Sequence, residues 1–210
     1  MGLENLDTFV IVAIAIITVP GVDTFYILNY SIAQGKKTGI YSAFGVCLGI
    51  LVHTSVAAFG LSAIIASSAI LYSIVKYAGA AYLIFLGIKT LITKNTFNLN
   101  SSVEIKKKTS KWGVLKKGIL VNILNPKAAL FFFSLFPQFI RPSYTDALYP
   151  FYILGVLFFL MALVWSLFLA ISASSVSSYV KSHPRFQIVF QKFSGLVFIA
   201  FGVKVALEKR

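Results

Sequence analysis

The chain has 210 residues, of which 58% are hydrophobic and 12% are charged. A soluble domain is about 45–50% apolar and about 25% charged, so this composition excludes an ordinary soluble protein. The net charge of +13 would favour nucleic-acid binding in a soluble chain, but here the basic residues lie in loops between long apolar segments, as in cytoplasmic loops of membrane proteins. Residues 38–75 and 147–180 carry no formal charge, and each stretch exceeds the roughly 20 residues that cross a bilayer. The sequence predicts an all-α, polytopic transmembrane helical bundle forming one domain over residues 1–210.

The first apolar segment, from Leu6 to Tyr30, is long for one straight crossing. Pro20 removes a backbone donor and clashes with the preceding turn, which predicts a break between Thr18 and Gly21. We expect Pro20 to be the first residue of a second half-helix. Asp23 follows, and it is the one acidic residue well inside an apolar segment. A charge at membrane depth costs about 2.5 kcal/mol or more, which indicates a functional residue.

The second and third segments are expected at about Gly39–Ser67 and Ile70–Thr93. Gly45 and Gly49 form a small-residue motif that lets two membrane helices approach closely. His53 lies on the same face, where it fits either a hydrogen-bonded packing residue or a proton relay. The lysine-rich residues 94–112 then predict a basic cytoplasmic loop between two halves, at about 1–93 and 113–210.

The fourth segment, at about Gly113–Phe139, is interrupted by Asn125 and Pro126. Asn favours the N-cap position and Pro the first helical position, so a second half-helix is expected to start there. Two further segments, at about 150–174 and 187–207, bring the total to six. The basic loops place both termini outside. A variant with five crossings and one re-entrant stretch stays open. Trp112 and Tyr149 are expected at the membrane interface.

Three segments per half would invert the second half relative to the first, and each half would begin with a broken helix. Paired breaks of this kind point to a transport site near the middle of the membrane. Half-helix starts carry free N–H groups and a positive dipole end, which could hold a carboxylate. Asp23 could hold an ammonium group or a coupling proton, or it could cap its own half-helix. Lys127 could pair with a substrate carboxylate or with Asp23, or it could extend to the membrane surface.

Motifs along nearly the whole chain resemble the lysine exporter and homoserine–threonine exporter family (LysE/RhtB). They are Pro20-Gly21-x-Asp23, Gln34-Gly35-x-x-x-Gly39, Gly45-x-x-x-Gly49-x-x-x-His53, Gly60-Leu61, Ala78-Gly79-Ala80-Ala81-Tyr82-Leu83-x-x-x-Gly87, Gly118-x-x-x-Asn122-x-x-Asn125-Pro126-Lys127-Ala128 and Phe136-Pro137-Gln138-Phe139, with Gly195 near the end. Val22 stands where the family usually has a second proline.

This resemblance implies a secondary exporter of amino acids or close derivatives in the bacterial inner membrane, driven by the proton gradient. It also implies that Asn122 is a substrate-binding residue. The expected substrate-binding residues are then Pro20, Gly21, Asp23, Asn122, Asn125, Pro126 and Lys127. The partners are then an amino acid, the lipid bilayer and a proton or other coupling ion, with no nucleic acid and no cofactor. The glycine faces fit either packing within the chain or a homodimer.

Three other functions are alternatives to the export of amino acids. An exporter of a cation or metal would need clustered His, Cys or carboxylate residues, which the sequence lacks. A membrane-embedded enzyme or redox carrier is disfavoured because Cys47 is the only cysteine and no nucleophile–base constellation is evident. A non-transporting packing subunit is the third alternative. The identity of the exported amino acid does not follow from the sequence.

Overall fold

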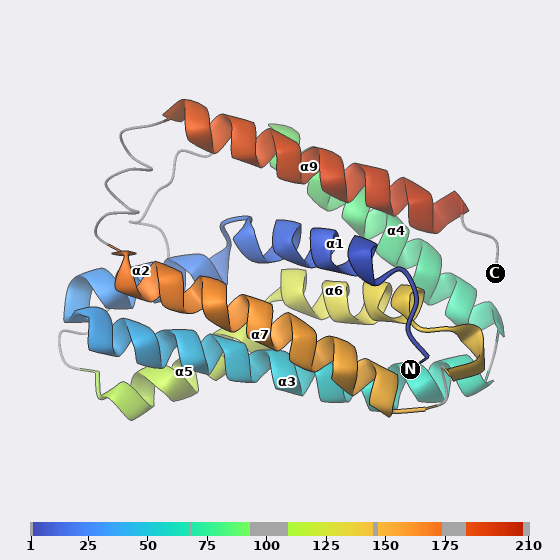
Figure 1. Ribbon diagram of the computed structural model, residues 1–210, viewed down its shortest axis with the longest axis horizontal. Helices are drawn as coiled ribbons and strands as arrows, with labels where there is room; N and C mark the ends of the chain where they lie inside the picture. Colours follow the sequence, from blue (N-terminus) through green and yellow to red (C-terminus); the bar gives the residue numbers. More distant parts are fainter. Residues whose placement is uncertain (1, 68, 93–108, 145–146, 174–183, 208–210) are drawn as a thin grey trace.

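The computed structural model describes residues 2–67, 69–92, 109–144, 147–173 and 184–207. These residues form a bundle of helices (Figure 1), which confirms the predicted all-α fold. In chain order the elements are α1 (Leu6–Thr18), α2 (Val22–Gln34), α3 (Lys36–Ser67), α4 (Ala69–Ile92), α5 (Lys111–Ile123), α6 (Pro126–Leu135), the short 3-10 helices η1 (Phe136–Phe139) and η2 (Pro142–Tyr144), α7 (Tyr149–Ile171) and α9 (Pro184–Leu207). Most of the basic loop predicted at 94–112 lies outside the described residues.

Two of the described helices are each long and apolar enough to cross a membrane, over Lys36–Leu61 of α3 and over α7. The pair α1 and α2 is bent by 51°, and α5 with the stretch Pro126–Phe139 is bent by 54°. Counting each bent pair as one span raises the number to four. Helices α4 and α9 have 24 residues each, which is long enough for a crossing. Six crossings therefore stay a prediction.

The first break lies where the sequence predicts it, but its detail differs. Helix α2 begins at Val22 with Gly21 as its N-cap, so the expectation that Pro20 is the first residue of this half-helix is wrong. The residue before a proline is pushed out of the helical region, and Val19 is accordingly extended, at φ −61° and ψ 120°. Gly21 is extended too, at φ −149° and ψ −169°. Pro20 therefore lies in a connection between two helices.

The second break follows the local rules closely. Asn125 is the N-cap of α6, Pro126 is its first residue, and the Asn125 side chain accepts a hydrogen bond of 3.0 Å from the backbone N–H of Lys127. Both expectations for this break are confirmed. An asparagine cap of this kind stabilises a helix start by about 1 kcal/mol.

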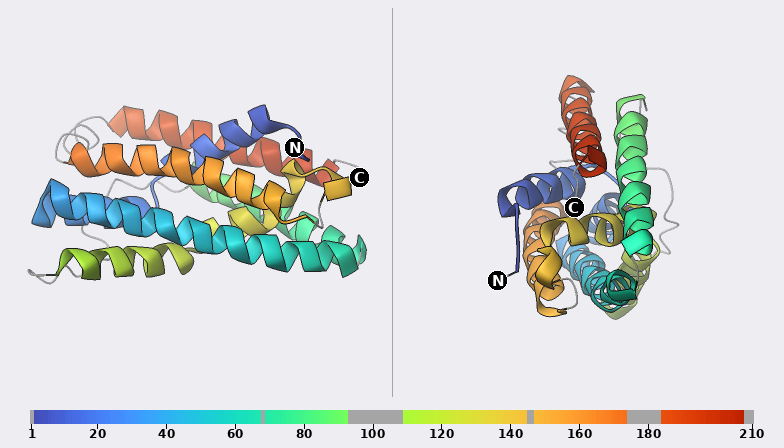
Figure 2. Two further views of the ribbon diagram at one scale, coloured as in Figure 1. Left: turned by 60° about the horizontal axis from the view of Figure 1, so that its bottom comes forward. Right: turned by 90° about the vertical axis from the view of Figure 1, so that its right-hand side faces the viewer.

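The glycines expected at close helix contacts are used within the chain. A Cβ on Gly45 would collide with the Leu115 carbonyl of α5, and a Cβ on Gly118 would lie 3.1 Å from the Cα of Gly45. In the same way, a Cβ on Gly87 of α4 would lie 2.7 Å from the carbonyl oxygen of Gly195 in α9. Viewed along the bundle, α4 and α9 lie side by side and extend away from the other helices (right view of Figure 2).

The buried side chains form two separate clusters. The phenylalanine cluster joins α1, α3, α4, α6, α7 and α9 through aromatic rings and aliphatic side chains; its phenylalanines are Phe9, Phe131, Phe132, Phe136, Phe139, Phe151, Phe158, Phe198 and Phe201. The tyrosine cluster joins α2, α3, α5 and α7, and consists of Tyr26, Ile27, Leu28, Tyr30, Ala43, Val46, Val114, Leu169, Ala170 and Ala173. Because lipid tails are as apolar as these side chains, dense packing rather than exclusion from water holds such clusters together. Figure 1 shows α1 and α6 toward one end of the bundle and α2 and α5 toward the other.

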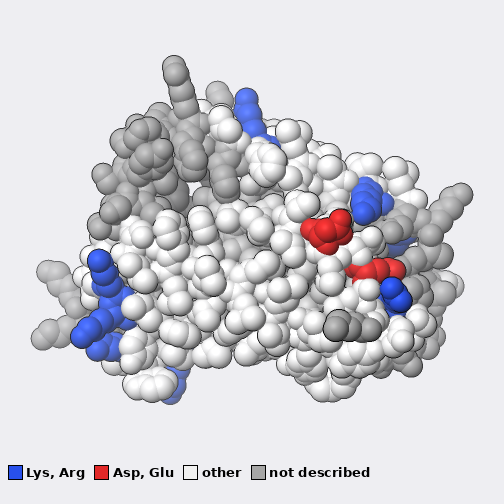
Figure 3. Space-filling view, in the orientation of Figure 1, with Lys and Arg blue, Asp and Glu red and all other residues white. Residues whose placement is uncertain are grey.

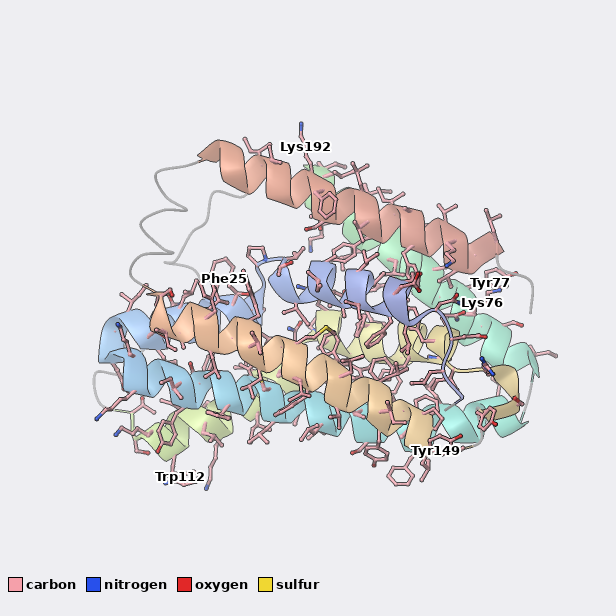
Figure 4. The ribbon with its side chains drawn as sticks, in the orientation of Figure 1. Phe25, Lys76, Tyr77, Trp112, Tyr149 and Lys192 are labelled. Atoms are coloured by element: carbon pink, nitrogen blue, oxygen red, sulfur yellow. The ribbon has the colours of Figure 1, made fainter. Side chains whose placement is uncertain are left out.

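The surface fits insertion in a bilayer. On the face shown in Figure 3, a group of basic side chains lies at the end where α3 and α5 begin, and the acidic side chains lie toward the opposite end together with further basic side chains. Trp112 and Tyr149 are 66% and 45% exposed, and they point outward at opposite ends of the bundle (Figure 4). Aromatic residues of this kind are enriched at both membrane interfaces.

Candidate functional site

A cavity of about 60 Å³ lies between the two helix breaks. This volume exceeds the roughly 10–15 Å³ that a cavity needs to hold one water molecule. Gly21 and Asp23 line it from the first break, and Asn122, Asn125 and Lys127 line it from the second. The structure thus brings together five of the residues that the sequence places at the site. The two prolines, Pro20 and Pro126, shape the breaks beside it.

The carboxylate of Asp23 is bound by two amides from the other half of the chain. Its Oδ2 accepts hydrogen bonds of 2.9 Å from Asn122 Nδ2 and of 2.9 Å from Asn125 Nδ2. The α2 helix has no side-chain cap, so the alternative that Asp23 caps its own half-helix is wrong. Its other oxygen, Oδ1, is buried and has no hydrogen-bond partner among the described residues. Asp23 therefore keeps one acceptor available at the cavity.

Lys127 also reaches across the two breaks. Its Nζ donates a hydrogen bond of 2.8 Å to the backbone carbonyl of Val19, at the end of α1. The amine is therefore directed into the break, neither out to the membrane surface nor onto Asp23. A Cβ on Gly21 would lie 3.8 Å from this nitrogen, so the glycine leaves the space beside it open. An ammonium group has three donors, and two remain after the bond to Val19.

His53 supports the second break from α3. Its Nε2 lies 3.0 Å from the backbone carbonyl oxygen of Asn122, and because a carbonyl only accepts, this nitrogen carries the hydrogen. The ring also stacks on Phe132, with centroids 5.6 Å apart and planes at 16°. The Asn122 carbonyl also accepts from the backbone N–H of Asn125 at 3.0 Å, so His53 adds a second hydrogen bond where α5 ends. The contacts match the packing role; the proton relay stays a prediction.

Three polar residues that line the cavity were not predicted from the sequence: Thr24 of α2, and Trp165 and Ser166 of α7. Ser166 Oγ accepts from Cys47 Sγ at 3.7 Å, whereas Trp165 Nε1 is buried without a partner in the described part of the chain. No break or charge marks this segment. The available signal is that Trp165 and Ser166 are the only residues with N–H or O–H side chains between 153 and 171.

Most of the remaining cavity wall is apolar and comes from both clusters. Ile16, Ile50, Phe131, Phe158 and Ala162 belong to the phenylalanine cluster, and Ile27, Val46 and Leu169 belong to the tyrosine cluster. The site therefore combines one carboxylate, one ammonium and several amides with a hydrophobic wall. The described residues contain no group of three or more His, Cys, Asp or Glu side chains that could hold a metal ion.

A cavity that holds a carboxylate, an amine and amides between two broken helices, inside an apolar helical bundle, is the arrangement of a membrane transport protein. The sequence profile of the family described as LysE type translocator matches residues 14–209, and the chain belongs to this family. It is 34% identical to the "Uncharacterized membrane protein YrhP" of Bacillus subtilis, over 98% of this chain and 100% of that protein. It is also 34% identical to the leucine efflux protein of Klebsiella pneumoniae, over 98% of this chain and 96% of the relative.

The leucine efflux protein of Salmonella typhimurium is 30% identical, again over 98% of this chain and 96% of the relative. No solved structure matches the chain.

Proposed function

We propose that this protein is a secondary active exporter of amino acids or close derivatives in the bacterial inner membrane. The observation that carries the proposal is the pairing of Asp23 and Lys127 at one cavity, each directed there by contacts with the opposite half of the chain. An amino acid has one ammonium and one carboxylate. The cavity offers one group of opposite charge to each of them.

In this proposal Asp23 Oδ1 accepts from the substrate ammonium, and Lys127 donates to the substrate carboxylate. The start of α2, which has no side-chain cap, adds backbone N–H groups and a positive dipole end on the side of the carboxylate. Hydrogen bonds with a charged partner contribute about 1.5–3 kcal/mol each. A few such bonds account for selective binding of a zwitterion in a small cavity.

Asp23 Oδ1, which accepts from the substrate ammonium in this proposal, would also bind the coupling proton. Oδ2 is occupied by two amides, so Oδ1 is the atom at which a proton and the substrate ammonium compete. Only one of them can occupy it at a time, which links release of the amino acid outside to uptake of a proton there. The inward proton gradient would then drive export.

An apolar side chain fits this site best. Isoleucine, leucine, valine, phenylalanine and alanine residues form most of the wall, and two of the relatives reported above are named leucine efflux protein. A second charge on the substrate would be left without a partner against this wall, at a high desolvation cost. We therefore place leucine and similar amino acids first among the substrates.

For the membrane arrangement we propose two inverted halves, about 1–93 and 113–210, joined by a cytoplasmic loop at 94–112. The similar bends of 51° and 54° in the first helix of each half support this arrangement, and the basic end of the bundle faces the cytoplasm. A single cysteine placed at residue 37 should then react with a thiol reagent only from the cytoplasmic side. Reaction from the outside would contradict the orientation.

The proposed function is tested with purified protein in liposomes, by following L-leucine movement under an imposed pH gradient. Asp23→Asn should reduce transport by about tenfold or more, because the neutral amide neither carries the charge nor exchanges the proton. Asp7→Asn is the matched control, since Asp7 is exposed in the first turn of α1. If transport by wild type and by Asp23→Asn responded equally to the pH gradient, this would contradict the role of Asp23.

The pairing itself is tested by combining Asp23→Asn with Lys127→Met. Both residues line one cavity, and groups that share a cavity typically show coupling of about 0.5–3 kcal/mol. The double variant should therefore lose less transport than the sum of the two single losses. Simple additivity would show that the two residues act independently.

A further inference from the structure

Three buried polar atoms of cavity-lining residues lack hydrogen-bond partners among the described residues: Asp23 Oδ1, Asn122 Oδ1 and Trp165 Nε1. The great majority of buried polar atoms in proteins are paired, so each exception needs an explanation. Here the residues that carry the three atoms all line one cavity and come from three helices, α2, α5 and α7. Their common location indicates that one ligand supplies the missing hydrogen-bond partners of all three atoms.

The chemistry of each atom is fixed by its surroundings. Asn122 directs its amide nitrogen at Asp23 Oδ2, so its remaining atom, Oδ1, is the carbonyl oxygen and can only accept. The free oxygen of the Asp23 carboxylate also accepts. The indole nitrogen of Trp165 can only donate. The cavity therefore requires a ligand that has donors at one point and an acceptor at another.

We propose that Trp165 determines specificity by donating its indole N–H to the substrate carboxylate, while Asp23 and Asn122 accept from the substrate ammonium. The inference rests on the proposed function and adds a residue from α7 to it. A carboxylate has two oxygens, so the indole and the Lys127 amine can each serve one of them. The bound amino acid would then connect α7 to both helix breaks.

A packing role alone explains Trp165 less well. The ring packs beside Phe168, with centroids 5.5 Å apart, and against the tyrosine cluster, and a phenylalanine would make similar apolar contacts. The indole N–H would only add an unsatisfied donor to such a contact. A site with a buried donor also discriminates strongly against ligands that lack the matching acceptor. Trp165 would accordingly separate amino acids from simple amines.

The experiment compares two ligands that differ in one group. L-Leucine and 3-methylbutylamine share the ammonium and the branched side chain, but the amine lacks the carboxylate. Calorimetry on the purified protein measures the binding of each to wild type, Trp165→Phe and Trp112→Phe. Trp112 is the matched control because it is exposed on α5, away from the cavity lining.

Trp165→Phe should weaken L-leucine binding by about tenfold to a hundredfold, as expected for a hydrogen bond to a charged group. It should change the binding of the amine by less than about twofold, and Trp112→Phe should leave both ligands unaffected. Unchanged leucine binding in Trp165→Phe would overturn the inference. Equal weakening of both ligands would overturn it too, since that is the result of a packing defect.

A second measurement does not depend on the folding of Trp165→Phe. In Trp112→Phe, Trp165 is the only tryptophan left, so its fluorescence reports on the cavity. Saturating L-leucine should shift this emission, and saturating amine should not. If calorimetry shows that leucine binds but the fluorescence does not change, the role of Trp165 is overturned, whereas the proposed function still stands. If wild type binds no amino acid at all, the proposed function fails, and this inference fails with it.

Discussion

The two helix breaks bend by similar angles, 51° and 54°, but they are stabilised in different ways. At the second break Asn125 caps α6 from within the same segment, and His53 of the neighbouring α3 adds a hydrogen bond to the Asn122 carbonyl. At the first break Gly21 supplies no side-chain cap. Its stabilising contacts come from the other half of the chain, where Lys127 binds the Val19 carbonyl and two asparagines bind Asp23.

The difference shows that similar interruptions in a sequence need not have equal roles. The second break has its own helix cap, and its side chains form the hydrogen bonds that hold the first break in place. The groups that would meet a substrate are therefore positioned mainly by residues 122–127. Substitutions in the second break should affect both breaks, whereas substitutions in the first should affect mainly one.

The largest effect is expected for Asn125→Ala. This change removes the cap of α6 and one amide from Asp23, so it should lower the free energy of unfolding by about 2–4 kcal/mol and abolish transport. Asn122→Ala removes only a contact to Asp23 and should cost less, about 1.5–3 kcal/mol. Denaturant unfolding of the two variants in detergent measures the difference. Equal losses would show that the cap of α6 contributes nothing.

A smaller effect is expected for Gly49→Ala. The added Cβ would lie 2.6 Å from Asn122 Cβ, so it should push Asn122 away from Asp23 and cost about 1–3 kcal/mol through overpacking. Gly60→Ala is the matched control on the same helix, because nothing lies within 4 Å of the added atom. Transport and thermal stability should fall in the first variant and stay near wild type in the second. A loss in Gly60→Ala of the same size would mean that α3 tolerates no alanine here.

The smallest effect on stability is expected for the two prolines. Pro126 occupies the first position of a capped helix, where a missing N–H has no cost, so Pro126→Ala should change stability by less than about 1 kcal/mol and preserve transport. Pro20→Ala should preserve stability as well but reduce transport more, because the first break has no cap to keep α1 and α2 separate. Transport assays on both variants at matched protein levels give the comparison. If Pro126→Ala lost more transport than Pro20→Ala, the first break would hold the second in place, which is the reverse of what we infer.

The positions of both breaks could be predicted because a proline acts on its own helix turn. The cap at Asn125 was predictable for the same reason. The start of α2 was not, since it depends on the extended conformations of both Val19 and Gly21 around Pro20. The partners of Asp23 lie 99 and 102 residues away along the chain, and local patterns do not specify such pairings. The resemblance to a family supplied Asn122, whereas Trp165 lies in a largely apolar helix where its only local signal is that it and Ser166 carry N–H or O–H groups.

The cavity lies between two close-packed clusters, and this position has an electrical consequence. Packed hydrocarbon has a low dielectric constant, so the membrane voltage falls mainly across the phenylalanine and tyrosine clusters rather than across the polar cavity. One elementary charge that crosses the whole membrane gains or loses about 2.3 kcal/mol per 100 mV, and a charge that reaches Asp23 from one side crosses only part of that field. A zwitterion carries no net charge. On the proposed function, the membrane potential would therefore act on the step that moves the proton and leave the step that moves the amino acid largely unaffected.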